Sequence, residues 1–106
     1  MDIRKTLLLA SFALVAFPAG AAEIEVRMLD KSETEGLYAF EPGFIRAEVG
    51  DTLVFNPVSK GHNTQSLLLP EGAKSWKGAN NDAVRVKLDK EGVYLYVCYM
   101  HQMMGM

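Results

Sequence analysis

Short apolar segments separated by turn residues constrain the fold of this chain more than any other feature of its sequence. Most of these segments have alternating apolar and polar residues or are rich in β-branched and aromatic residues, and Gly, Pro or Asp lies just after most of them. The pattern predicts strands at 24–28, 44–49, 52–55, 64–69, 84–88 and 93–98. Residues 71–77 interrupt it and are expected to form a loop or a single helical turn. Short strands at this spacing favour an all-β sandwich or barrel, and 106 residues allow one domain.

The N-terminal segment has the features of a secretory signal peptide. Residues 1–5 are basic, residues 6–17 form an uncharged apolar run, and residues 19–21 (Ala-Gly-Ala) suit signal peptidase. The alternative is an uncleaved anchor, but the run falls short of the roughly 20 residues that cross a bilayer. We therefore expect a signal peptide at 1–21, export to the periplasm, and a mature domain at 22–106 with no stable membrane association.

The charge of the chain and its single cysteine exclude several kinds of protein. With 11 basic and 13 acidic residues the net charge is −2, and no basic run interleaves with aromatic residues, so nucleic acid is not an expected partner. Cys98 has no second cysteine with which to form an intramolecular disulfide. A lone thiol in an oxidising compartment is buried and inert, paired between chains, or bound to a metal. The sequence shows no nucleophile–base pair and no phosphate-binding loop, so we do not expect an enzyme.

The last ten residues, VCYMHQMMGM, gather groups that bind soft metals. Cys98, His101 and Met106 follow one another as Cys-x2-His-x4-Met, and His62 lies between two predicted strands. Loops cluster at the ends of an antiparallel sandwich, so His62 can converge on the terminal segment. Two imidazoles, a thiolate and a weak axial thioether form the blue-copper arrangement, whereas methionine is a poor zinc ligand. The pattern predicts one copper ion that cycles between Cu(I) and Cu(II).

The sequence resembles the cupredoxins, or blue copper proteins, and within them the pseudoazurin branch. The resemblance lies in GHNTQS and GVYLYVCYMHQMMGM, and also in EIEVRMLDK, FEPGFIRAEVGDTLVF and LPEGAKSWKG. It implies a cupredoxin-type Greek-key β-sandwich in which His62, Cys98, His101 and Met106 bind a single type 1 copper. It also implies that Asn63 forms a hydrogen bond across the site and holds the Cys98 loop.

The resemblance further implies a monomeric periplasmic carrier that shuttles single electrons. Its expected partners are periplasmic redox proteins, including a cytochrome donor and a denitrification enzyme such as copper nitrite reductase. The solvent edge of His101 is the expected electron port. The apolar side chains of Met100, Met103 and Met104 suit transient docking. Four lysines could steer an acidic partner or simply be scattered and solvated: Lys31, Lys60, Lys74 and Lys77.

Two alternative functions stay open from the sequence. The methionine-rich end also suits a periplasmic copper chaperone or storage protein. The abrupt ending instead suggests an inert, truncated fragment. An electron carrier requires reversible one-electron cycling and an intense thiolate-to-copper(II) absorption, whereas a chaperone requires tight Cu(I) binding without that absorption.

Two departures from the family pattern lead to further expectations. Met100 stands where the family usually has proline, and its restored N–H is free to bond to the Cys98 sulfur. The family continues beyond the axial methionine with a strand and a helical tail, so we expect an incomplete sandwich that is truncated after Met106. An axial ligand at a frayed chain end is expected to be poorly held, leaving water or a carboxylate to compete with its sulfur.

Overall fold

The computed structural model describes residues 20–106, and the predicted signal peptide at 1–21 therefore lies almost entirely outside the described residues. The all-β prediction is confirmed. The elements are β1 (Glu23–Ser32), β2 (Gly36–Glu41), β3 (Thr52–Pro57), β4 (Gln65–Leu68), β5 (Val84–Lys87), β6 (Leu95–Val97) and the 3-10 helix η1 (Tyr99–Met104). Within residues 20–106, no helix has the length and apolar character needed to cross a membrane.

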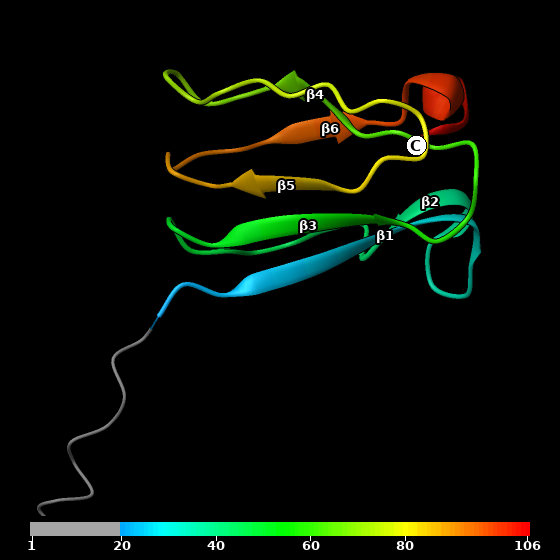
Figure 1. Ribbon diagram of the computed structural model, residues 1–106, viewed down its shortest axis with the longest axis horizontal. Helices are drawn as coiled ribbons and strands as arrows, with labels where there is room; N and C mark the ends of the chain where they lie inside the picture. The colour runs from blue at the N-terminus through cyan, green and yellow to red at the C-terminus, as the bar shows by residue number, and fades with distance from the viewer. Residues whose placement is uncertain (1–19) are drawn as a thin grey trace, which may run out of the picture.

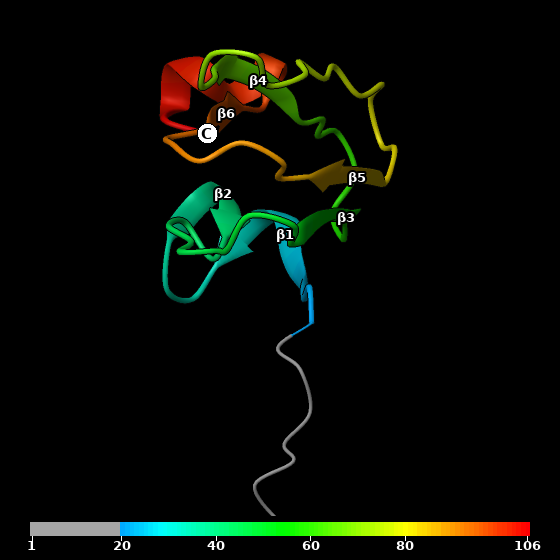
Figure 2. The same ribbon diagram turned by 90° about the vertical axis from the view of Figure 1, so that its left-hand side faces the viewer.

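The strands form two sheets that face each other (Figure 1). One sheet has the order β2-β1-β3-β5, and the other pairs β4 with β6. β1 runs antiparallel to β2 and parallel to β3, which in turn runs antiparallel to β5. Turned by 90°, the molecule shows the β4–β6 pair on one side and β1, β2 and β3 on the other (Figure 2). The apolar sides of both layers meet between them.

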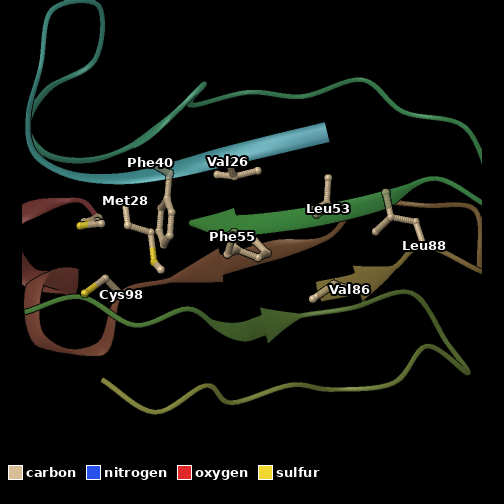
Figure 3. Close-up of a cluster of buried hydrophobic side chains, with 9 residues drawn as sticks. Val26, Met28, Phe40, Leu53, Phe55, Val86, Leu88 and Cys98 are labelled. Atoms are coloured by element: carbon tan, nitrogen blue, oxygen red, sulfur yellow. The ribbon is translucent and has the colours of Figure 1, made fainter. Parts of the chain in front are cut away.

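The core follows the alternation of the sequence. Val26 and Met28 of β1 are fully buried, while Glu25 and Arg27, which alternate with them, are exposed, as the period-2 pattern predicts. Phe55 of β3 is also fully buried, and its ring meets Phe40 and Tyr96 edge-on at centroid distances of 5.8 and 5.0 Å. Phe55 therefore links strands from the two sheets. Figure 3 shows this cluster, which comprises Val26, Met28, Phe40, Leu53, Phe55, Val86, Leu88, Cys98 and Met106.

β2 is a strand that the sequence pattern did not predict. Gly36 begins it at φ +96°, and only Ala39 and Phe40 are buried, whereas Leu37 is 66% exposed. The apolar Leu37 faces solvent, and the adjacent residues Ala39 and Phe40 are both buried. The segment therefore lacks the alternation by which the other strands were recognised. Its register with β1 places Phe40 opposite Met28 and completes the core.

The predicted strand at 44–49 is wrong. The segment forms no strand, and its two terminal apolar residues, Phe44 and Val49, are 76% and 58% exposed. It lines one side of an open groove of about 1040 Å³, and residues 92–96 line another. In the part of the chain that the structure describes, β6 pairs only with β4, and no strand pairs with residues 44–49. An apolar alternation becomes a strand only when a neighbour accepts its backbone hydrogen bonds.

Asp51 connects the start of β3 to the start of β1. Its Oδ1 accepts a hydrogen bond from the Ala22 N–H at 2.8 Å, and its Oδ2 accepts one from the Glu48 N–H at 2.9 Å. These two main-chain donors, the Ala22 amide first, hold the pKa of the Asp51 carboxyl below its usual range. The contact fixes the register in which the two parallel strands begin.

Residues 71–77 form a loop without a helical turn.

Candidate metal centre

Three segments meet at one end of the sandwich, near the C-terminus in Figure 1. The loop between β3 and β4 carries His62, the residue after β6 is Cys98, and η1 carries His101. The Cys98 Sγ lies 3.8 Å from Nδ1 of His62 and 3.4 Å from Nδ1 of His101. The three ligand atoms all lie within 4.8 Å of one another. The structure thus brings together Cys98, His62 (36 residues before it) and His101 (3 residues after it).

The two sulfur–nitrogen distances, 3.8 and 3.4 Å, fit one small metal ion. Ligand atoms about 2.0–2.3 Å from a common ion lie roughly 3.5 Å apart at trigonal or tetrahedral angles. His62 and Cys98 are fully buried, and His101 is partly exposed. A thiolate and two imidazoles in a largely dry pocket suit copper, since sulfur favours Cu(I) and imidazole suits both oxidation states.

Met106 is hydrogen-bonded back to the start of the loop formed by residues 98–106. Its side chain is 3% exposed and belongs to the core. The Cys98 N–H donates to the main-chain oxygen of Met106 at 2.6 Å, and the Met106 N–H donates to the carbonyl of His101 at 3.2 Å. Gly105, at φ +93°, provides the left-handed turn that returns the chain to Cys98. The expectation that Met106 is poorly held is therefore wrong, because main-chain hydrogen bonds and core packing both restrain it.

The segment that carries His62 is held by the loop between β4 and β5. The Gly61 N–H donates to Oδ1 of Asn81 at 2.7 Å, and the Asn81 N–H donates back to the His62 carbonyl at 2.8 Å. Gly61 itself adopts φ +93°, which favours glycine. Thr64 accepts a hydrogen bond from the Trp76 indole at 3.1 Å. These hydrogen bonds position the segment that carries His62.

Asn63 joins the two loops that carry the donors. Its Oδ1 accepts a hydrogen bond from the Tyr99 N–H at 2.7 Å. Its Nδ2 donates to the Gly78 carbonyl and to Oε1 of Gln65, both at 3.1 Å. The side chain lies where the sequence interpretation put it, and its contact to the Cys98 loop is through the residue after the cysteine.

The expected Met100 hydrogen bond is not found. Among residues 20–106, the hydrogen-bonding contacts of the Cys98 sulfur are with the two histidine rings, and no hydrogen bond connects it to the Met100 N–H. The prediction was wrong because the 3-10 turn that follows Cys98 determines where this N–H points.

Two neighbours of the histidines were missed by the sequence interpretation. Oδ1 of Asp30, in β1, lies 2.7 Å from Nε2 of His62. The Tyr38 ring, in β2, stacks on the His101 ring with centroids 4.5 Å apart and planes 10° from parallel. Neither residue lies in a metal-binding motif. No local pattern identifies them, because each reaches the site through strand pairing.

The four candidate steering lysines are distributed unevenly. Lys31 follows Asp30, and Lys60 lies two residues before His62, so both are close in sequence to residues of the site. Lys74 instead lines a shallow depression with Lys87 of β5 and with Asp89. The steering role of the four lysines stays a prediction.

Comparisons with known proteins agree with this geometry. Residues 26–106 match the family described as copper binding proteins, plastocyanin/azurin family. The chain is 41% identical over 99 residues to pseudoazurin of Paracoccus pantotrophus, covering 92% of this chain and 68% of the relative. It is 38% identical over 112 residues to pseudoazurin of Methylorubrum extorquens, covering 100% and 75%.

Solved structures show the same likeness in three dimensions. A Sinorhizobium pseudoazurin superimposes with a TM-score of 0.77 at 46% identity, over 80% of this chain and 68% of the other. Pseudoazurin from Methylobacterium extorquens AM1 gives 0.76 at 40% identity, over 79% and 69%. The fold is thus a cupredoxin fold, and copper is the cofactor. The chain belongs to the plastocyanin/azurin family of copper-binding proteins, and within it to the pseudoazurins, which makes it a blue copper electron-transfer protein and not an enzyme.

Proposed function

We propose that His62, Cys98, His101 and Met106 bind a single copper ion and that this site carries one electron at a time between periplasmic redox proteins. The observation that carries the proposal is the convergence of one sulfur and two imidazole nitrogens within 4.8 Å. Copper bound by such ligands supplies a one-electron couple, Cu(II)/Cu(I). Met106 would supply a thioether sulfur, and the burial of its side chain in the same cluster as Cys98 supports this role.

The protein residues keep the site rigid and dry. Rigidity matters because a site that rearranges little when its charge changes exchanges electrons quickly. Asn63 joins the two ligand loops, and the backbone of Met106 fixes the start of the Cys98 loop. His62 and Cys98 are shielded from water, whereas His101 is partly exposed. The ring of His101 is therefore the port through which the electron enters and leaves.

The surface around His101 suits brief contacts with a partner. Tyr99, Met103 and Met104 are 62%, 97% and 63% exposed, so apolar side chains surround the port. The proposed partners are periplasmic redox proteins, including a cytochrome donor and a denitrification enzyme such as copper nitrite reductase. Such exchange requires weak binding, for which a monomer with a small apolar patch is sufficient.

The proposed location is the periplasm, after removal of residues 1–21. The basic start, apolar run and Ala-Gly-Ala sequence support this proposal. N-terminal sequencing of protein from a periplasmic fraction should begin at Ala22. A start at Met1 in a membrane fraction would instead show an uncleaved anchor.

A copper titration tests the proposed function. Wild-type protein should bind one Cu(II) with an intense visible thiolate-to-copper absorption and should cycle reversibly by voltammetry. Cys98→Ser should lose this absorption, whereas Ser75→Ala, an exposed serine in the 71–77 loop, should keep it. Tight Cu(I) binding without the absorption would favour the chaperone alternative. Absence of cooperative unfolding with and without copper would favour the inert fragment.

A further inference from the structure

Asp30 contacts the buried histidine on the side opposite Cys98. Its Oδ1 is 2.7 Å from Nε2 of His62, while Nδ1 of the same ring faces the Cys98 sulfur at 3.8 Å. The His62 side chain is fully buried and that of Asp30 is 61% exposed. The imidazole therefore lies between a carboxylate and the ligand cluster.

The position of Asp30 is set by its backbone. The Asp30 N–H donates to Oγ of Ser59 at 3.0 Å, and the Ser59 N–H donates to the carbonyl of Met28 at 3.1 Å. These bonds connect the end of β1 to the loop that leads from β3 to His62. The carboxylate and the imidazole, 32 residues apart, are thus brought together by main-chain contacts.

The hydrogen bond determines which nitrogen of His62 carries the proton. An ionised carboxylate only accepts hydrogen bonds, so Nε2 must donate. The neutral ring then has its lone pair on Nδ1, the nitrogen that faces Cys98. A hydrogen bond of this kind also makes the ligating nitrogen a better electron donor.

His101 has different surroundings. Its ring stacks on Tyr38, and within the described residues no hydrogen bond involves its Nε2. Asp30 therefore places a negative charge next to one of the two imidazoles only. A negative charge one ring away from the metal favours the state with the higher positive charge.

We propose that Asp30 is a positioning residue of the copper site, which fixes the Nε2–H tautomer of His62 and, through its charge, lowers the reduction potential. The proposal rests on the proposed function for its effect on the potential. Its effect on the tautomer concerns the protein without metal and is measured separately.

Two substitutions separate the two effects. Asp30→Asn keeps an acceptor oxygen for Nε2 and removes the charge, whereas Asp30→Ala removes both. Asp89→Asn is the matched control, because Asp89 is exposed and lies beyond the far end of β5. It changes the net charge equally without touching a ligand.

The first experiment is ¹⁵N NMR of the imidazole rings in the copper-free protein at neutral pH. Wild type, Asp30→Asn and Asp89→Asn should show His62 protonated at Nε2, and Asp30→Ala should show a mixture of tautomers. A proton on Nδ1 of His62 in the wild type, or an unchanged tautomer in Asp30→Ala, would overturn the tautomer assignment whether or not copper binds.

The second experiment measures Cu(II) and Cu(I) affinities and the potential. Asp30→Ala should lose about 10- to 100-fold in Cu(II) affinity, the usual loss when a hydrogen-bond partner of a ligand is removed. Asp30→Asn should lower the ratio of Cu(II) to Cu(I) affinity about tenfold, which raises the potential by about 59 mV. Shifts no larger than that of Asp89→Asn would overturn the role of the charge. Failure of the wild type to form the coloured site would instead refute the proposed function, and the NMR result would stand.

Discussion

Replacing Asn63 by alanine should destabilise the copper-free protein and loosen the Cys98 loop. The side chain is 5% exposed and makes three hydrogen bonds, one accepted from the Tyr99 N–H and two donated to Gly78 and Gln65. Alanine removes all three and introduces no compensating polar group. The loops that carry His62 and Cys98 would then be joined by fewer direct contacts.

The expected cost follows from the number of bonds. A typical hydrogen bond contributes about 1 kcal/mol net, so Asn63→Ala should lower the free energy of unfolding by about 3 kcal/mol. That is a large part of the roughly 5–15 kcal/mol that stabilises an ordinary domain. Asn63→Asp keeps the oxygen that accepts from Tyr99 but places an oxygen against the Gly78 carbonyl. It should therefore destabilise the protein as well.

Urea unfolding of the copper-free protein provides the assay, since bound metal would add its own binding energy. Gln65→Ala removes only one of the three bonds and should cost about 1 kcal/mol. Copper dissociation from loaded Asn63→Ala should also be faster than from the wild type. If Asn63→Ala and wild type share one unfolding midpoint and one dissociation rate, Asn63 does not connect the ligand loops as described.

Three further perturbations test other parts of the structure. Met106→Leu keeps the apolar volume but lacks the thioether, so the reduction potential should change, while Met103→Leu, at a 97% exposed position, should match the wild type; equal potentials in all three proteins would rule out Met106 as axial ligand. Phe55→Ala should cost about 3–5 kcal/mol in urea unfolding, because the ring is fully buried between the sheets, and a cost below about 1 kcal/mol would contradict that packing. The Asp51 pKa is lowered from 3.8 in the folded protein, so its contribution to stability is complete above that value and is lost as pH falls through the lower folded pKa. The stability difference between wild type and Asp51→Asn should therefore be constant near neutral pH and shrink only in strong acid; a decline already at pH 6 would contradict the assignment.

The sequence by itself determined the all-β class and pointed to a copper ligand set. Alternation at Val26 and Met28 identifies a half-buried strand without knowledge of its partner, because the period of a strand is a local property. The Cys-x2-His-x4-Met spacing is equally local, since one short loop carries all three side chains. The structure brings Cys98 and His101 together with His62, in agreement with that interpretation.

Only the tertiary structure decided which segments pair and what surrounds the ligands. The alternation at 44–49 predicts a strand, yet within residues 20–106 no neighbouring strand accepts its hydrogen bonds. In contrast, β2 pairs with β1 despite its irregular pattern. Tyr38 and Asp30 reach the two histidines from these paired strands, at separations in sequence that no motif encodes. Side-chain periodicity depends on a few adjacent residues, whereas contacts across a site depend on the register of strands that are distant in the chain. The ligand residues can therefore be recognised from the local sequence, whereas strand pairing determines which side chains contact the two histidines.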